Sequence, residues 1–474
     1  MKSVVSNVSL LLAILHLAGT ISTTPIQAQA IVPTLSSTST SSISPAEDHT
    51  PVAKTVEISQ LEKLEPIVDQ ENVIKEVTQI EQNWENQFEG YFGANFSDRA
   101  ITAKDIADTL GKVAIQTGKK PALIYILPRS QQLELVLITP GNPPLHKRVL
   151  PANRDALLQQ VKELTKAITS PRFRDTNRYL PPAQQLYQWM ISPLEAELQA
   201  QRIDTLIFCV GEGLRTMPFA VLQDGKHFLV EKYSFSRIPA FKLTDTIYGD
   251  LRNSPVLAMG ASEFKDQNPL PAVPLELSAI RKNLWRGKSF LNQEFTLTNL
   301  QSQRALQPFK IIHLATHAVF QPGVPSQSYV QFWDTRLTLD KMRQLRWNNP
   351  PVELLVLSAC QTAIGDKDAE LGFSGLAVQA GVKSALASLW NVSDEGTLGL
   401  MVEFYRELKT APIKAEALRQ AQIAMLTGQV RLEEGQLHMS RGNLDLPPAL
   451  AALENEKFSH PYYWAAFTVV GSPW

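Results

Sequence analysis

The sequence has little cysteine and no excess of charge of either sign. Only Cys209 and Cys360 are cysteines among its 474 residues. That number is too small for a fold built on disulfide bridges, although it still allows one bridge between the two. The formal net charge is -1, from 45 basic and 46 acidic residues. The chain therefore lacks the basic surface that binding to nucleic acid or to an anionic membrane requires, and we expect no nucleic-acid partner.

Several motifs that would indicate a function are also missing. The sequence contains no phosphate-binding glycine loop, no zinc-ligand spacing and no G-x-S-x-G motif. We therefore expect no metal and no cofactor. A 34-residue repeat is absent too, which argues against a helical repeat array. The overall composition, 44% hydrophobic and 19% charged residues, is typical of a globular soluble protein. The length predicts two or three domains.

The first thirty residues have the pattern of a secretory signal peptide. Lys2 precedes an apolar run at 8–15, and Ala28, Gln29 and Ala30 supply the small residues of a cleavage site. We expect cleavage after Ala30 and export to the periplasm or the extracellular space. An N-terminal membrane anchor is the alternative, but the run is shorter than the roughly 20 residues that span a bilayer. No later stretch is long enough, so no integral membrane segment is expected after signal cleavage.

The rest of the chain divides by composition. Residues 31–56 are rich in Ser, Thr and Pro, which predicts a disordered linker. Residues 57–94 are polar with apolar positions at roughly helical spacing, which predicts one or two amphipathic helices. From about residue 95 strand-like and helix-like segments alternate. This alternation predicts an α/β fold with a largely parallel sheet and helices on both faces.

The alternating part consists of two series, one at 95–250 and one at 251–474. The first series predicts strands at 122–127, 133–138 and 205–210, with helices at 156–168 and 184–198. The second series predicts strands at 256–260, 309–316, 352–359, 384–390 and 464–470, with helices at 275–285, 373–380, 395–409 and 413–426.

Two residues with catalytic chemistry follow strands of the second series. His317 comes directly after strand 309–316 and Cys360 directly after strand 352–359, at the strand ends where open α/β sheets bind ligands. They are 43 residues apart, close to the roughly 50 residues found in caspases, whose histidine also comes first. A neighbouring imidazole raises the thiolate fraction of a cysteine and later protonates the leaving amine. A lone cysteine after an apolar strand is more often only a small buried hydrophobe.

Two residues of the same types have other expected roles. His313 lies inside strand 309–316, on the face of Ile311 and Ala315, and is expected to be a packed or hydrogen-bonded core histidine. Cys209 lies in the middle of an apolar run and is expected to be structural.

Several segments, in the same order along the chain, resemble blocks of the CHAT family over roughly residues 95–474. They are GLRTMPFAVL at 213–222, IHLATH at 312–317, VLSACQTAIG at 356–365, GVKS at 381–384, SLWNVSDEGT at 388–397, EALRQAQ at 416–422 and HPYYWAAF at 460–467.

The resemblance implies a caspase-like fold, with a catalytically empty half at 95–250 and an active half at 251–474. It implies an exported bacterial (cyanobacterial-type) cysteine endopeptidase that cleaves a protein substrate through His317 and Cys360. The backbone N–H groups of Ala318 and Cys360 would bind the oxyanion. A glycine usually follows this histidine in the relatives, and Ala318 would be strained if the position requires a positive φ.

Acidic residues near these segments have two readings each. The run LWNVSD at 389–394 resembles separase, which cuts after arginine, so Asp394 and Glu395 are expected to pair with an arginine or lysine of the substrate. The alternative is that they cap the helix that follows. Asp366, Asp368 and Glu370 predict a solvated, flexible turn rather than a metal site.

Two other interpretations of the whole chain stay open at this point. One is a catalytically silent binding or scaffold protein that keeps the caspase-like fold, because a fold does not determine a function. The other is a Cys209–Cys360 disulfide that masks the thiol until it is reduced.

Overall fold

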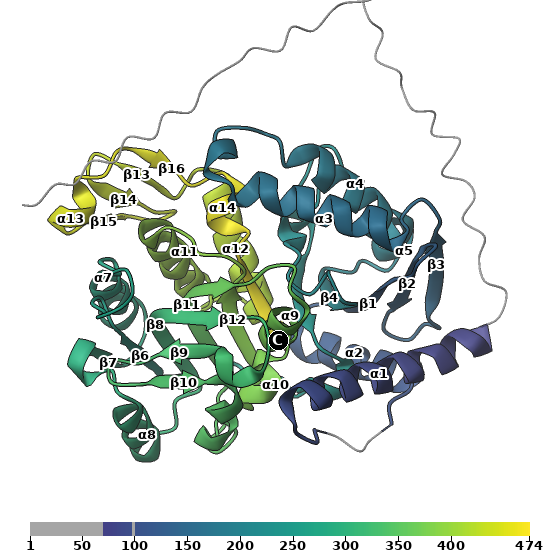
Figure 1. Cartoon of the computed structure of the whole chain (residues 1–474), viewed down its shortest axis with the longest axis horizontal. Coiled ribbons are helices and arrows are strands. Elements are labelled where there is room, and N and C mark those ends of the chain that lie inside the picture. Colours follow the sequence, from purple (N-terminus) through teal and green to yellow (C-terminus); the bar gives the residue numbers. More distant parts are fainter. Residues whose placement is uncertain (1–69, 97–99) are drawn as a thin grey trace, which may run out of the picture. The chain divides into compact units, whose positions relative to one another are not determined.

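The residues that the structure describes, 70–96 and 100–474 of a computed structural model, build one large sheet with helices on both faces (Figure 1). The expected signal peptide and linker, and the first part of the expected helical segment, lie outside the described residues. Within them, thirteen strands form the large sheet and four short strands form a second one. None of the helices in this part of the chain has the length and apolar character needed to cross a membrane.

The strands are β1 (Pro121–Pro128), β2 (Leu133–Ile138), β3 (Leu145–Val149), β4 (Thr205–Val210), β5 (Ser234–Ile238), β6 (Val256–Gly260), β7 (Gly287–Leu291), β8 (Ile311–Phe320), β9 (Tyr329–Gln331), β10 (Arg336–Thr338), β11 (Leu354–Thr362), β12 (Ser384–Ser388), β13 (Arg431–Glu433), β14 (Gln436–His438), β15 (Asn443–Asp445), β16 (Glu456–Lys457) and β17 (Phe467–Gly471).

The helices are α1 (Gln70–Phe92), α2 (Ala103–Thr117), α3 (Arg154–Thr169), α4 (Leu180–Met190), α5 (Ser192–Ala200), α6 (Leu229–Lys232), α7 (Val273–Ser278), α8 (Leu297–Leu306), α9 (Lys367–Ser374), α10 (Leu376–Ala380), α11 (Asp394–Glu407), α12 (Lys414–Leu426), α13 (Pro448–Ala451) and α14 (Pro461–Trp464).

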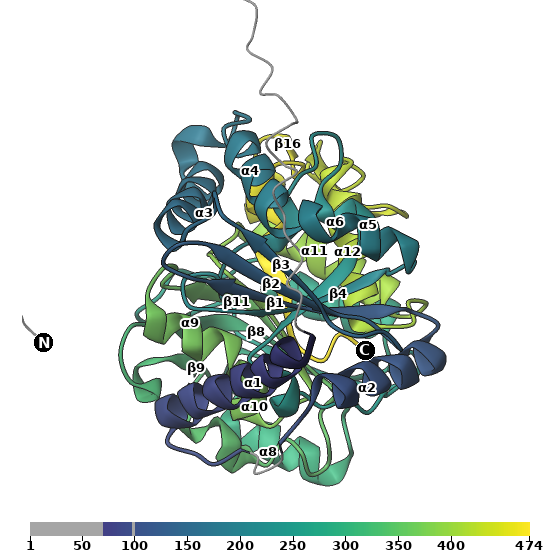
Figure 2. The same cartoon turned by 90° about the vertical axis from the view of Figure 1, so that its right-hand side faces the viewer.

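The sheet is mostly parallel, as expected. Its main path is β10-β9-β8-β11-β12-β17-β5-β4-β1-β2-β3, and β6 pairs with β8 and β7. Parallel pairs join β8, β11 and β12 as well as β5, β4 and β1, whereas the hairpins β1–β2–β3 and β8–β9–β10 are antiparallel. Figure 2 shows the sheet nearly edge-on, with α1, α2, α9 and α10 on one side and α3–α6, α11 and α12 on the other.

The last strand of the chain joins the two halves of the sheet. β17 pairs antiparallel with β12 on one side and parallel with β5 on the other, where Val470 lies opposite Arg237. Arg237 is buried, and its guanidinium donates to the carbonyl oxygens of Arg215 and Met217 and to Thr468 Oγ1 on β17. The 95–250 and 251–474 series therefore share one continuous sheet.

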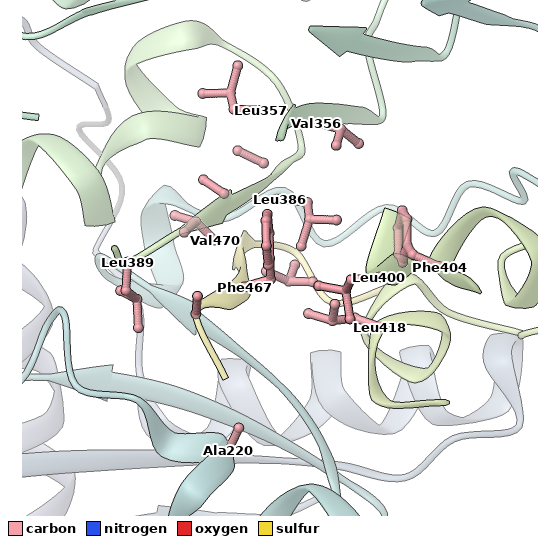
Figure 3. Packing of buried hydrophobic residues seen from close by; sticks show 14 of the residues in the cluster. Ala220, Val356, Leu357, Leu386, Leu389, Leu400, Phe404, Leu418, Phe467 and Val470 are labelled. Atoms are coloured by element: carbon pink, nitrogen blue, oxygen red, sulfur yellow. The ribbon is translucent and has the colours of Figure 1, made fainter. Parts of the chain in front are cut away.

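The core of the second series lies between the sheet and two long helices. Val356 of β11, Leu386 of β12 and Phe467 of β17 pack in one cluster with Leu400 of α11 and Leu418 of α12 (Figure 3). All five side chains are at most 2% exposed, so each contributes roughly 1.5–3 kcal/mol of apolar burial. This layer supports the strands that carry the site.

Several elements differ from the sequence-based expectation. Strands β8 and β11 continue beyond the predicted ends, to Phe320 and Thr362. The helix expected at 184–198 is two helices, α4 and α5, with a proline at the start of α5, where its missing N–H is tolerated. The expected helix at 275–285 is α7 followed by a π-helical turn at Ala279–Leu284. Periodicity also missed the short strands β3, β5, β7, β9, β10 and β13–β16.

Helix α1 is held to the sheet by a buried carboxylate. Glu81, which is 1% exposed, accepts hydrogen bonds from Tyr125 Oη at 2.7 Å, Phe241 N at 2.9 Å and Lys242 N at 2.8 Å. These donors come from β1 and from the segment after β5. One side chain thus satisfies three donors that burial would otherwise leave unpaired.

We predict that Glu81→Ala destabilises the protein by about 3 kcal/mol or more, because it leaves those three donors without an acceptor. Chemical denaturation followed by circular dichroism measures the change. Glu163→Ala, at an exposed position of α3, is the control and should change stability by no more than about 0.5 kcal/mol. Equal midpoints for the two variants would contradict the role of Glu81.

Candidate active site

The site forms where strand β8 changes its neighbour. β6 pairs with β8 up to Ala315, and β9 pairs with β8 from Ala318 onward. His317 therefore lies between the end of one neighbouring strand and the start of the other. β6 ends at Gly260. This position favours glycine, because a Cβ there would lie 2.5 Å from the carbonyl oxygen of Ala315. On the opposite edge, the pairing of β8 with β11 shifts by one residue between Leu357 and Ala359.

His317 is held by a loop that follows β6. Residues 261–272 form this loop, which Leu270 N closes by donating to Ser262 O at 2.9 Å. The carbonyl oxygen of Asn268 lies 2.8 Å from His317 Nε2, and the Phe264 ring lies 4.6 Å from the imidazole. The pKa of His317 is lowered by burial, and the Asn268 contact raises it only in part. The imidazole is therefore neutral near pH 7.

This arrangement fixes the tautomer of His317. Since a neutral imidazole has one donor and one acceptor nitrogen, Nε2–H donates to Asn268 O and Nδ1 is left as the acceptor. The sequence analysis missed Phe264 and Asn268. A signal was present, because both follow the apolar strand β6, whose end lies at the same edge of the sheet as His317.

Cys360 is placed beside His317 by the backbone. In the parallel pairing of β11 with β8, Ala359 lies opposite His317 and Cys360 opposite Ala318. His317 and Cys360 lie inside strands β8 and β11 and not just after them, which corrects the predicted strand ends. The register brings the backbones of these two residues onto neighbouring strands at the carboxyl end of the parallel pair, and a dyad of their side chains stays a prediction.

The other cysteine is far from this edge. Cys209 is free and fully buried in β4, and β12, β17 and β5 lie between β11 and β4. Adjacent strands are about 4.8 Å apart, so the two cysteines are separated by roughly 19 Å. A disulfide requires Cα atoms within about 7 Å, which rules out the Cys209–Cys360 bridge. Burial also raises the pKa of the Cys209 thiol well above its usual value.

Ala318 has ordinary strand geometry. It lies within β8, lacks a positive φ and is paired with Cys360 on one side and Val330 on the other. The alanine in place of glycine therefore causes no backbone strain. Binding of an oxyanion by the N–H groups of Ala318 and Cys360 stays a prediction.

Asp394 and Glu395 lie at the same end of the sheet, in the first turn of α11 after β12. Ser393 caps the helix by accepting from Gly396 N, so neither acidic residue is the N-cap. Asp394 Oδ2 instead accepts from the backbone N–H of Ala272, in the loop that also carries Asn268. Burial raises the pKa of Asp394 to about 7, and burial also raises the pKa of Glu395.

A cleft lies next to the loop that holds His317, on the side of β9 and β10. It has a volume of about 830 Å³ and combines the 263–267 part of the loop with the β9–β10 hairpin. Phe264 and the half-exposed Trp333 contribute apolar surface. The charged lining consists of Glu263, Lys265, Asp266, Asp334 and Arg336.

The acidic segment after Cys360 is ordered, which corrects the expected flexible turn. Asp366 caps α9 by accepting from the N–H groups of Asp368 and Ala369, both at 3.0 Å. Glu370 is 1% exposed and accepts from Gly213 N at 2.9 Å and Thr216 Oγ1 at 3.1 Å. The segment that follows Cys360 is thereby tied to the first series.

His313 has the core position that the strand pattern predicted. It is fully buried, its Nε2 lies 2.9 Å from Glu276 Oε1 of α7, and its ring packs against Tyr405 at 5.5 Å.

The chain belongs to the CHAT-domain family. The CHAT domain model matches residues 180–472, more than half of the chain, and the match begins at α4 instead of near residue 95. No curated protein matches the sequence.

Solved structures with a similar arrangement include two of the Saccharomyces cerevisiae separase–securin complex. The two matches have 10% and 11% sequence identity and TM-scores of 0.44 and 0.48. Each covers 85% of this chain and 34% of the matched chain. A complex of Porphyromonas gingivalis RgpB pro- and mature domains matches with 10% identity and a TM-score of 0.37, over 67% of this chain and 75% of that one. The chain spans about a third of the length of the separase chains.

We predict a pH-dependent stability difference between the wild type and Asp394→Asn. The pKa of Asp394 is about 7 in the folded protein and near 3.8 when exposed, so the folded state keeps a proton that the unfolded state has lost. The wild type therefore loses up to about 4 kcal/mol of stability as the pH rises from 4 to 7. Asparagine has no proton to lose, and its oxygen can still accept from Ala272 N.

Calorimetric melting at pH 4 to 8 measures this difference. The melting temperature of the wild type should fall relative to that of Asp394→Asn over this range. Asp266→Asn, in the loop near the site, should follow the wild-type curve. Parallel curves for the wild type and Asp394→Asn would show that Asp394 is not protonated in the fold.

Proposed function

We propose that the protein is a caspase-like cysteine endopeptidase that cleaves a partner protein through His317 and Cys360. The observation that carries the proposal is the parallel register of β8 and β11, in which Cys360 lies opposite the residue after His317. The neutral, oriented imidazole of His317 supports the same role. In this proposal the 251–474 half is catalytic and the 95–250 half is its catalytically empty companion.

The proposed reaction begins with transfer of the Cys360 thiol proton to His317 Nδ1. The thiolate attacks the peptide carbonyl carbon, and the C–N bond breaks as the imidazolium returns the proton to the leaving amine. Water, deprotonated by His317, then hydrolyses the thioester and regenerates the thiol. Asn268 O stabilises the imidazolium by accepting from Nε2–H, and backbone N–H groups of Ala318 and Cys360 bind the oxyanion.

The proposed substrate is a protein segment that lies along the cleft between the 261–272 loop and the β9–β10 hairpin. Phe264 and Trp333 would contact its apolar side chains. We also propose that the enzyme acts outside the cytoplasm. A mature N-terminus at Ile31, found by mass spectrometry of the protein from its native host, would support export, and an intact Met1 would contradict it.

We predict that Cys360→Ala and His317→Ala each abolish cleavage and leave the fold unchanged. Loss of either member removes the nucleophile or its base, so the rate should fall by a factor of 10³ or more. The measurement is the release of new peptide N-termini from a denatured proteome, with circular dichroism to check the fold. Cys209→Ala is the matched control and should cleave at the wild-type rate, because that thiol is buried.

A thiol-reactive peptidyl electrophile distinguishes the peptidase from a silent scaffold. The active enzyme should be labelled at Cys360 and not at Cys209, and His317→Ala should slow the labelling. If Cys360 is no more reactive than Cys209 in the native protein, or if Cys360→Ala still cleaves, the peptidase proposal is wrong and the scaffold interpretation takes its place.

We predict a preference for arginine or lysine before the scissile bond, with Asp394 as the pairing carboxylate. A cation placed beside Asp394 would lower the pKa of this carboxyl group from about 7 and keep it ionised. Asp394→Asn should then reduce kcat/KM for arginine substrates about tenfold or more and spare those with leucine. Glu395→Gln tests the neighbouring carboxylate in the same assay. Equal losses for arginine and leucine would leave Asp394 only its contact with Ala272.

A further inference from the structure

A histidine far from the proposed active site is buried without a hydrogen-bond partner. His146 lies in β3 and is 6% exposed, and neither of its ring nitrogens has a partner among the described residues. A buried polar group of this kind costs free energy unless something pairs with it.

Two carboxylates converge on this histidine from other elements. His146 lies opposite Val136 in the pairing of β2 with β3. Glu134 is two residues before Val136 in β2. Since side chains alternate along a strand, Glu134 lies on the same face of the sheet as His146. Helix α1 covers that face and contributes Glu76. One ligand atom from each of these three side chains lies within 4.8 Å of the other two.

We propose that Glu76, Glu134 and His146 bind a divalent transition-metal ion, for which zinc is the best fit. Imidazole nitrogen and carboxylate oxygen are both ligand types that bind zinc, and water would supply the fourth ligand. Bonds of about 2.1 Å would bring the ligand atoms to about 3.4 Å from one another, a movement that rotation of the glutamate side chains provides. The ligands come from a helix and two strands, so the sequence shows no zinc-type spacing.

The basic residues around the cluster fit a supporting role. Arg129 Nη2 lies 3.3 Å from Glu76 Oε1, and Arg129 Nε lies 3.2 Å from Glu134 Oε2. Gln132 Nε2 donates to Glu134 Oε1 at 3.0 Å, and Arg148 Nε lies 4.0 Å from the same oxygen. A carboxylate has about four acceptor positions, so it can accept these hydrogen bonds and bind a metal ion at the same time. Such hydrogen bonds orient metal-binding carboxylates.

The ion would fix one end of helix α1. Glu76 lies near the start of α1, Glu81 binds β1 and the segment after β5, and Phe92 at the other end packs close to Gly375, between α9 and α10. α1 therefore runs from the proposed ion to the helices that follow Cys360 (Figure 1). Metal binding at β3 would strengthen the docking of this whole helix, whether or not the protein is a peptidase.

Titration of the full chain with ZnCl₂ tests the site, by calorimetry and by competition with a chromophoric chelator. The experiment uses Cys360→Ala protein, since a free thiol near His317 would itself bind zinc. We expect one zinc ion per chain at micromolar or lower Kd and a rise in melting temperature on binding. Glu76→Gln, at a partly exposed helix position that tolerates the change, should weaken binding tenfold or more.

His146→Gln should weaken zinc binding at least as much as Glu76→Gln. His227→Gln, at an exposed histidine beside Asp224, is the matched control and should bind zinc like the parent protein. Absence of binding at micromolar zinc would overturn the proposal. Binding with an affinity that neither Glu76→Gln nor His146→Gln changes would also overturn it, because the ion would then lie elsewhere.

Discussion

The parallel pairing of β8 with β11 is the constraint on which the candidate site depends. It puts Cys360 opposite the residue that follows His317, so the backbones of two residues 43 positions apart in sequence lie on neighbouring strands. The change of neighbour from β6 to β9 then opens the other side of β8. Through that opening the 261–272 loop reaches the imidazole. The sheet thus sets the position of the histidine, and the loop supplies its hydrogen-bond acceptor.

Buried charged side chains connect elements around this sheet, and two of them join its halves. Arg237 of β5 reaches β17, Glu370 of α9 accepts from the segment after β4, and Glu81 of α1 accepts from β1 and from the segment after β5. Each of these three side chains has hydrogen-bond partners, because an unpaired buried charge would cost several kcal/mol. The 95–250 half therefore has a structural role next to the candidate site, since it holds α9 just after Cys360.

The apolar strands were predictable because burial on both faces requires a continuous apolar run. This rule also separated His313, inside the run, from His317 beyond it. The rule failed for short elements such as β5, where Ser234, Ser236 and Arg237 interrupt the apolar pattern. The sequence pattern also gave the wrong prediction for Glu370. An acidic residue after a strand is expected to be solvated, and only the structure shows its buried partners Gly213 and Thr216.

The sequence by itself determined the α/β class, the cores of the strands and the identity of His317 and Cys360 as candidates, since these follow from local periodicity and from motifs. Tertiary structure alone decided that Asn268 orients His317, that Asp394 binds Ala272 and that β17 joins the halves. Asp394 and Ala272 are 122 residues apart. Such contacts depend on how distant segments pack, and no local pattern of residues encodes that packing.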